Sequence, residues 1–398
     1  MSYIVGEFFN ALGYVSTFDL EKLLRVYWFF FLFDFPRYVL TDIGIFFYEL
    51  FKRFRRNNQE QLFLLELRER PPLVSVVIAA LNEEDTIEGT LLSLKEQTYT
   101  NLQIIIVDDG STDKTPEICN RMKKWMDYSF IRLEERSGKS AALNYGSRMA
   151  KGKYVVFADS DTTFDRDAVF KLIKGFFDSS VGAISGNVRP RNGRKNLLTG
   201  LQNIEYNFTI TIARRIRAKF GILPIISGAF GVFRKELLKP IGMHEPGPGN
   251  DSDLTIRIRK LGYKIAFAPD AIALTNVPEN MHNLILQRWR WDRNLIKTRF
   301  KKHRDVYDFS SKNFRIRDSL SFIDSLFFHV VLAFVSLIYL IDISINFPHI
   351  LLFILMVNYI LYFISELIEF LIVLALSERK WDDFSYIIYL PLFNPYKL

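Results

Sequence analysis

The chain has 398 residues, of which 49% are hydrophobic, and a formal net charge of +8. This length allows one large domain with membrane elements, or two medium domains. The positive charge does not indicate nucleic-acid binding, because the basic residues gather where hydrophobic segments end, a pattern that flanks membrane spans and suits anionic lipids. We therefore expect membrane lipids, and no nucleic acid, among the partners. A single cysteine, Cys119, excludes an internal disulfide and fits a reducing compartment.

The first 70 residues are predicted to form a membrane segment and a cytoplasmic linker. Residues 24–51 are mostly aromatic and aliphatic, and the segment is long enough to cross a bilayer of about 30 Å. Charged residues and a proline interrupt it, so a kinked span and a pair of interfacial helices both fit, and we favour the span. The basic cluster at 52–56 would then be cytoplasmic. Residues 57–70 read as a charged helix that ends at two prolines.

Residues 71–295 show the alternation of apolar runs and amphipathic segments that is typical of an α/β domain. The expected strands are 73–80, 102–107, 129–133 and 154–158, and the expected helices are 84–97, 115–126 and 139–149. Continuous apolar runs of this length fit strands buried on both faces of a parallel sheet. Repeated β-α units predict a doubly wound, Rossmann-like sheet, in which ligands bind at the carboxyl ends of the strands.

The last hundred residues are expected to associate with a membrane. Residues 296–318 mix basic and aromatic side chains and predict an amphipathic interface helix. Residues 319–378 hold two apolar runs, 320–345 and 349–376, which we predict to be transmembrane helices. The remaining segment, 379–398, is apolar but short, so it is either interfacial or cut before a further helix.

The last predicted span carries a polar stripe. Its members, Asn358, Tyr362, Glu366 and Glu369, fall on one helical face. Intramembrane carboxylates usually face a cavity or a partner. The stripe either lines a path for a polar molecule or has its two glutamates near the cytoplasmic end, where they reach water.

Polar residues follow three of the predicted strands. The first strand ends in Ala79 to Glu83, the second in Asp108 and Asp109, and the fourth in Asp159-Ser160-Asp161. Carboxylates at strand ends accept hydrogen bonds from a ribose or a base, and two carboxylates two residues apart point the same way and suit a divalent ion. Helix capping and solvated turns are the alternatives.

Three further motifs lie downstream. Lys139 follows Ser137-Gly138, but the glycine that a P-loop requires is replaced by Leu133, so we exclude an ATPase, although Lys139 could contact a phosphate at its helix start. Asp251 is a candidate general base, with helix capping as its alternative. A Gln-x-x-Arg-Trp set stands before the chain turns hydrophobic and supplies an amide, a planar cation and an indole. Its members are Gln287, Arg290 and Trp291.

The order of these motifs resembles the membrane-bound, processive branch of the family 2 glycosyltransferases, which includes cellulose, chitin, hyaluronan and poly-N-acetylglucosamine synthases. The resemblance covers about residues 71–295. It implies a GT-A fold, a UDP-sugar donor such as UDP-N-acetylglucosamine or UDP-glucose, and Mg²⁺ or Mn²⁺. It also implies a polysaccharide or lipid-linked acceptor and a multi-pass protein of the inner or plasma membrane with a cytoplasmic catalytic domain. A homo-oligomer or an accessory subunit is a further expected partner.

The resemblance also implies roles for particular residues. Nucleotide binding would fall to Ala79, Asn82, Glu83, Asp108, Asp109, Lys139, Asp159, Gln287 and Arg290. The metal would be bound by Asp161 and Asp159, the acceptor would contact Phe230, Arg234 and Trp291, and Asp251 would be the catalytic base. Asp251 would deprotonate an acceptor hydroxyl, which attacks C1 of the donor and inverts its configuration.

One position departs from the family pattern. Relatives carry an acidic residue immediately before the catalytic aspartate, where this chain has Asn250. Loss of that charge is expected to lower the pKa of Asp251. Two other functions stay open from the sequence: transfer of one sugar to a lipid carrier, and a catalytically silent subunit that binds nucleotide.

Overall fold

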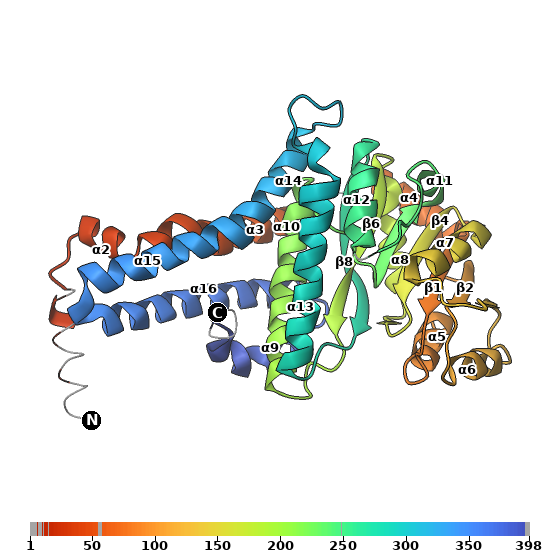
Figure 1. Ribbon diagram of the computed structural model, residues 1–398, viewed down its shortest axis with the longest axis horizontal. Coiled ribbons are helices and arrows are strands. Elements are labelled where there is room, and N and C mark those ends of the chain that lie inside the picture. The colour runs from red at the N-terminus through yellow and green to blue at the C-terminus, as the bar shows by residue number, and fades with distance from the viewer. Residues whose placement is uncertain are drawn as a thin grey trace. The chain divides into compact units, whose positions relative to one another are not determined.

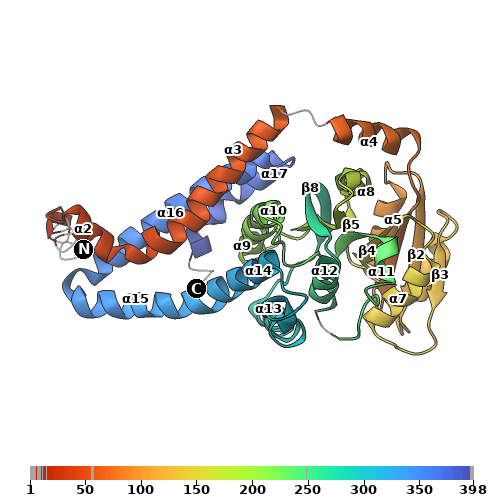
Figure 2. The same ribbon diagram turned by 90° about the horizontal axis from the view of Figure 1, so that it is seen from above.

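The computed structural model describes residues 6, 10, 12–14, 16–54, 58–247 and 249–394, without the side chains of residues 53, 295 and 329. The predicted basic cluster at 52–56 therefore lies largely outside the described residues. The chain divides into two compact units, Arg55–Ser321 and Met1–Phe54 with Phe322–Leu398. Figures 1 and 2 show their elements, and each unit is described by itself.

The described strands of the first unit form one mixed sheet in the order β3-β2-β1-β4-β7-β6-β8-β5. The strands are β1 (Val74–Ala80), β2 (Leu102–Asp108), β3 (Ser129–Arg132), β4 (Tyr154–Asp159), β5 (Thr163–Phe164), β6 (Val181–Pro190), β7 (Phe230–Arg234) and β8 (Lys264–Thr275). β3, β2, β1 and β4 are parallel, as predicted. β7 is antiparallel to both β4 and β6, so the sheet is mixed rather than wholly parallel.

The register of the parallel strands brings their polar ends to one edge. Ala79 pairs with Asp159 of β4, and Ala80 pairs with Asp108 of β2. Apart from Ser75 and Gln103 near the strand starts, these strands are apolar and mostly buried, so the next polar residues come where each strand leaves the sheet.

Two layers of helix cover the sheet, and alternate strand residues face each layer. Val76 and Ile78 pack with α5 (Ile87–Lys95), α6 (Thr115–Met122) and α8 (Ala168–Ile173) in one buried cluster. Val77 packs with α7 (Lys139–Met149), α11 (Lys235–Leu238) and α12 (Asn250–Lys260) in another. α7 approaches closely, because a Cβ at Gly146 would lie 2.4 Å from Val77.

The unit also contains further helices. They are α4 (Asn58–Glu69), η2 (Lys174–Phe177), α9 (Leu197–Tyr206), η3 (Asn207–Ile212), α10 (Ala213–Lys219), α13 (Met281–Leu295), η4 (Ile296–Lys302) and η5 (Arg304–Val306). α13 lies beside α9 (Figures 1 and 2), and Arg288 Nη2 is 2.6 Å from Glu205 Oε2.

The interface helix predicted over 296–318 is wrong as an element. The stretch forms the π-helical η4, the short 3-10 helix η5 and a loop, before α14 (Ile316–Leu326) begins. Charged contacts with α12 hold it, including Arg259–Asp318 at 2.6 Å and Lys260–Asp305 at 2.8 Å. The stretch therefore belongs to the same compact unit as the sheet, and the predicted boundary at residue 295 is too early.

The second unit is helical. Besides the end of α14 it contains α2 (Leu20–Val26), η1 (Phe30–Leu40), α3 (Thr41–Phe54), η6 (Phe327–Val331), α15 (Leu332–Asn346), η7 (Pro348–Ile350), α16 (Leu351–Leu376), α17 (Lys380–Phe384) and η8 (Ser385–Leu392). Within the described residues, one helix, Pro348–Leu376, is long and apolar enough to cross a membrane, with 29 residues and a mean hydropathy of 2.1. Leu332–Asn346 is apolar but shorter.

The other two predicted spans are not single regular helices. Residues 24–51 are divided among α2, η1 and α3, and Pro36 lies inside the π-helical piece. Proline has no N–H to donate and its ring crowds the preceding turn, which disrupts a regular α-helix. Residues 320–345 are likewise divided among α14, η6 and α15.

The polar stripe of α16 packs against other helices of its unit. Asn358 Nδ2 donates to the hydroxyl of Tyr339 at 2.6 Å, and the hydroxyl of Tyr362 donates to Asp34. Glu366 and Glu369 are only 3% and 4% exposed. The glutamates therefore do not reach water at the helix end.

Candidate active site

A cavity of about 280 Å³ lies at the carboxyl ends of β1, β2 and β4. Its lining residues are Ala79, Ala80, Leu81, Glu83, Asp109, Arg136, Lys139, Asp159, Ser160 and Asp161. Six of them are residues that the sequence singled out: Ala79, Glu83, Asp109, Lys139, Asp159 and Asp161. The parallel register thus gathers the polar strand ends into one site, as predicted.

Asn82 and Asp108 do not line this cavity. Asp108 has no exposed surface, and it accepts from Ser111 N at 3.2 Å and contacts Arg132 Nε at 3.4 Å. Asn82, in the left-handed region at φ 55°, accepts from Thr112 N at 2.9 Å. Both residues shape the loops after β1 and β2, and their contact with a nucleotide stays a prediction.

Asp109 fixes the start of α7. Its Oδ1 accepts from Ser137 N at 2.7 Å, and its Oδ2 accepts from Gly138 N at 2.9 Å. Gly138 has φ 91°, a conformation that favours glycine. The carboxylate therefore organises the turn that delivers Lys139, the first residue of α7, to the cavity.

Lys139 and the two strand-end carboxylates form the charged centre of the cavity. Lys139 Nζ donates to Asp159 Oδ1. Burial alone would lower the pKa of Lys139, but the carboxylates of Asp159 and Asp251 raise it above its usual value. Burial and then the charge of Asp159 raise the pKa of Asp161. Two carboxylates that repel each other are a favourable setting for a cation.

This donor set fits a divalent ion that is shared with a ligand. The described residues contain no cluster of three or more His, Cys, Asp or Glu side chains arranged to hold a metal by themselves. Mg²⁺ characteristically uses one or two carboxylates and completes its shell with water and substrate phosphates. Asp161 and Asp159 supply two such carboxylates at the cavity.

Arg191, which the sequence reasoning missed, adjoins Asp161. Its Nη2 donates to the Asp161 carbonyl oxygen at 2.7 Å, and its Nη1 donates to Asn276 Oδ1 at 3.3 Å. Arg191 follows the long buried strand β6, so the rule that polar residues follow buried strands would have found it.

Asp251 lies in the first turn of α12 and packs against the backbone of Gly228. A Cβ at Gly228 would lie 2.4 Å from Asp251 Oδ2, so only glycine leaves room for the carboxylate. Burial raises the pKa of Asp251 to about 6. The charges of Lys139 and Arg214 lower this pKa, and the charge of Asp159 raises it further. This rise is relative to an ordinary aspartate, and the expected effect of Asn250 in place of an acidic residue stays a prediction.

Asn250 connects α12 to α7. Its Nδ2 donates to Ser140 Oγ at 3.2 Å, and Ser140 Oγ in turn donates to the Glu245 carbonyl at 2.9 Å. Ser140 is adjacent to Lys139. The amide at position 250 can donate this hydrogen bond, whereas an ionised carboxylate cannot.

Phe230 and Arg234 lie at opposite ends of β7, and neither lines the cavity at the strand ends; their acceptor role stays a prediction. Phe230 has no exposed surface, pairs with Ala158 next to Asp159, and packs at a tilt against Phe164, with ring centroids 5.0 Å apart. Arg234 pairs across the sheet with Tyr154, the first residue of β4, and donates to the Val181 carbonyl at 2.7 Å. Because β7 runs antiparallel to β4, Arg234 lies at the opposite strand end from Asp159.

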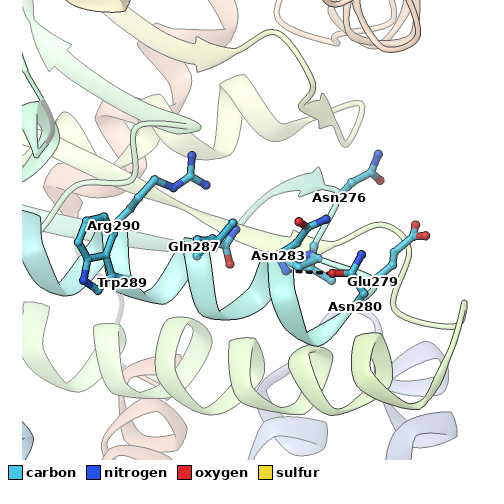
Figure 3. Close-up of a pocket in the computed structure, with 10 residues that line it drawn as sticks. Asn276, Glu279, Asn280, Asn283, Gln287, Trp289 and Arg290 are labelled. Carbon is cyan, nitrogen blue, oxygen red and sulfur yellow. Dashed lines mark hydrogen bonds between the residues drawn. The ribbon is translucent and has the colours of Figure 1, made fainter.

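A second, larger cavity of about 650 Å³ lies along α13 and the loop before it. Figure 3 shows its polar lining, Asn276, Glu279, Asn280, Asn283, Gln287, Trp289 and Arg290. The dashed line in that view is the 2.9 Å bond from Asn283 N to Asn280 Oδ1, which caps the helix. Amides, an indole and a guanidinium are side chains that can hydrogen-bond to and stack on sugar rings.

The Gln-x-x-Arg-Trp set is thus only partly gathered in this second cavity. Gln287 and Arg290 line it, but Trp291 does not, and the Arg288 guanidinium lies 4.7 Å above the Trp291 ring. The two cavities share no lining residue. They adjoin each other through Arg191, which bonds both to Asn276 and to Asp161.

Comparisons with known proteins show what the chain is similar to. The structure is similar to a mannosyltransferase, PcManGT from Pyrobaculum calidifontis, solved in complex with GDP-Man and Mn²⁺. The TM-score is 0.58 at 23% sequence identity, and the match covers 85% of this chain and 95% of that one. The unit that contains the sheet therefore has a GT-A fold.

The sequence matches a protein family and curated relatives over part of its length. The family described as Glycosyl transferase family 2 matches residues 75–242 of this chain. The chain is 36% identical over 220 residues to the poly-beta-1,6-N-acetyl-D-glucosamine synthases of Staphylococcus epidermidis and Staphylococcus aureus (strain MSSA476). That match covers 55% of this chain and 53% of each relative, so the chain spans about half the length of the curated relatives it matches.

Proposed function

We propose that the protein is an inverting glycosyltransferase that transfers N-acetylglucosamine from UDP-N-acetylglucosamine to a growing polysaccharide at a membrane. The observation that carries the proposal is the cavity in which Lys139, Asp159 and Asp161 meet at the strand ends of a family 2 domain, with the charge of Asp251 acting on Lys139. The choice of sugar is supported by the names of the 36% identical relatives.

The donor nucleotide would occupy the cavity at the strand ends. Ala79 and Glu83 would border the nucleoside together with Asp109, although Asp109 uses its carboxylate to hold the turn before α7. Lys139 would offer a positive charge to the diphosphate. On nucleotide binding it would exchange part of its contact with Asp159 for phosphate oxygens.

Asp161 and Asp159 would hold Mg²⁺ or Mn²⁺ between the protein and the diphosphate. When bound, the ion supplies positive charge that stabilises the leaving UDP. The protein's own contribution is to fix the two carboxylates. Thr275 Oγ1 donates to Asp161 Oδ2 at 3.4 Å, and Arg191 fixes the Asp161 backbone.

Asp251 would act as the general base. Its carboxylate accepts the proton of an acceptor hydroxyl, whose oxygen attacks C1 of the donor sugar on the side opposite the diphosphate. The bond between C1 and the acceptor oxygen forms as the bond between C1 and the diphosphate breaks, so an α-linked donor gives a β-linked product and UDP. The raised pKa of Asp251 makes it a stronger base than an ordinary aspartate.

The cavity along α13 would receive the acceptor glycan. It adjoins Asp161 through Arg191 and presents Asn283, Gln287 and Trp289 to a sugar chain. Arg290 would reach toward the diphosphate when the donor is bound. The apolar helix Pro348–Leu376 would anchor the protein in the membrane, with the catalytic unit on the cytoplasmic side.

The experiment is product analysis with the purified chain in nanodiscs and Mg²⁺ or Mn²⁺. Radiolabelled UDP-N-acetylglucosamine and UDP-glucose are supplied separately, and products are sized and digested with matching β-glycosidases. We expect high-mass β-linked N-acetylglucosamine polymer. A short lipid-extractable product would replace the proposal with transfer to a lipid carrier. UDP binding without transfer from either donor would favour a silent subunit.

A further inference from the structure

His303 is buried between two charged residues of α12. It is 3% exposed, its Nε2 lies 2.7 Å from Asp253 Oδ1, and its Nδ1 lies 2.9 Å from Lys260 Nζ. Lys260 Nζ also contacts both oxygens of Asp305, at 2.9 and 2.8 Å. His303 and Asp305 belong to the stretch after α13, so this network joins that stretch to α12.

The neighbours of His303 determine which ring nitrogen carries hydrogen. A lysine ammonium has three donors and no acceptor, so Nδ1 must accept from Lys260. In the neutral ring the other nitrogen then carries the hydrogen, and Nε2–H donates to Asp253. His303 thus acts as a donor at one end and as an acceptor at the other.

Asp253 is held from several directions. Lys302 Nζ lies 2.6 Å from its Oδ1, and Arg257 Nη2 lies 2.5 Å from its Oδ2. Although burial alone would raise it, hydrogen bonds from His303 and Lys302 hold the pKa of Asp253 well below its usual range. The side chain is therefore an ionised anchor for the first turn of α12.

The same helical turn carries Asp251. Its N-cap, Gly249, is left-handed at φ 86° and makes no side-chain hydrogen bond to the helix. Residues two apart on a helix differ by about 200° in direction, so Asp251 and Asp253 point to nearly opposite sides. Asn250 holds this turn to α7 through Ser140 Oγ, and Asp253 holds it to the stretch after α13.

We propose that His303 is a positioning residue for the glycosyl transfer, because its contact with Asp253 holds the first turn of α12 and with it the carboxylate of Asp251, while its contact with Lys260 holds the last turn of the same helix. The inference rests on the proposed role of Asp251 as the base. η4 continues directly from α13, so His303 also links the helix along which the acceptor cavity lies to the helix that carries the base. The link would thereby keep the acceptor hydroxyl and the Asp251 carboxylate at a fixed distance from each other.

The test compares His303→Ala with His303→Gln. A glutamine amide offers one N–H donor and one carbonyl acceptor, as the neutral imidazole does, whereas alanine offers neither. The control is Asp308→Asn in the same stretch, because Asp308 bonds to Ser310 and makes no described bond to α12. Transfer from UDP-N-acetylglucosamine is measured on the full chain in nanodiscs, together with UDP affinity by calorimetry.

For His303→Ala we expect kcat to fall by about 10- to 100-fold, the loss typical of a displaced catalytic group, with KM for the donor and UDP affinity within about twofold. His303→Gln should recover most of kcat, and Asp308→Asn should match the wild type. Wild-type kcat in His303→Ala would overturn the inference while leaving the proposed function intact. Equal loss of UDP affinity and kcat in both His303 variants would also overturn it, because that pattern indicates general loss of structure. No transfer by the wild-type chain would overturn the proposed function and this inference together.

Discussion

Gly228→Ala tests the placement of the base with the smallest change that the chain allows. The added Cβ would lie 2.4 Å from Asp251 Oδ2, 2.6 Å from Oδ1 and 2.7 Å from Cγ. Gly228 does not have a positive φ, so alanine can adopt the same backbone conformation. The backbone N–H that bonds to Asp251 is also retained. The substitution therefore removes only the space that the carboxylate occupies.

The magnitude follows from the overlap. Ordinary contact begins at 3.4 Å, so the carboxylate must retreat by about 1 Å. A misplacement of about 1 Å in a catalytic geometry costs on the order of 100-fold in rate, which corresponds to about 2.7 kcal/mol of activation free energy. We expect kcat for transfer from UDP-N-acetylglucosamine to fall by about that factor. Donor KM should change little, because Gly228 does not line the donor cavity.

The matched control is Gly89→Ala. Gly89 lies inside α5, and a Cβ there would have only Thr163 Cγ2 as a neighbour, at 3.8 Å. This variant should keep wild-type kcat and gain slightly in stability, because alanine has the higher helix propensity. Wild-type kcat in Gly228→Ala would refute the reasoning, since it would mean that Asp251 does not rely on that space.

Three further predictions concern the charged groups of the catalytic unit. Burial raises the pKa of Asp251 to about 6, and only the ionised carboxylate is a base. We therefore expect kcat to rise with pH to a plateau above pH 6 and to be about tenfold lower at pH 5. A flat pH profile of kcat from pH 5 to 8 would contradict this. Removal of divalent ions with EDTA should abolish transfer, and Asp161→Asn should need more Mn²⁺ to regain it; full activity in EDTA would exclude a metal role. Asp318→Asn should lower the free energy of unfolding by about 3 kcal/mol, measured as a lower Tm, because the buried Arg259 loses its ion partner. The side chain of Arg259 is only 8% exposed. An unchanged Tm would show that its hydrogen bonds to backbone carbonyls are enough to stabilise the buried charge.

The cavity at the strand ends could be predicted because it depends on local sequence rules. Each of the three strands is an apolar run followed at once by polar residues, and parallel pairing places those ends together. The same rules could not choose between Asp108 and Asp109. Adjacent residues of an extended chain point to opposite faces, so only one of them lines the cavity, and the structure shows that it is Asp109.

The contacts that the sequence did not reveal are long-range or depend on strand direction. Arg234 was predicted at the acceptor site, but the antiparallel insertion of β7 carries it to the far end of β4. The sequence around Gly228 does not predict that Asp251, which belongs to another element, packs against it. The contacts of His303 could not be predicted either, because they form only when the stretch after α13 packs against α12.

The proposal of an inverting transferase is tested most directly by one comparison of wild-type chain and Asp251→Asn. Both are purified in nanodiscs and given UDP-N-acetylglucosamine with Mn²⁺, and the released UDP and the anomeric configuration of the product are measured together. We expect the wild type to release UDP in step with β-linked N-acetylglucosamine. The variant should bind UDP as tightly as the wild type but form no product. An α-linked product, or a variant as active as the wild type, would contradict the mechanism proposed for Asp251.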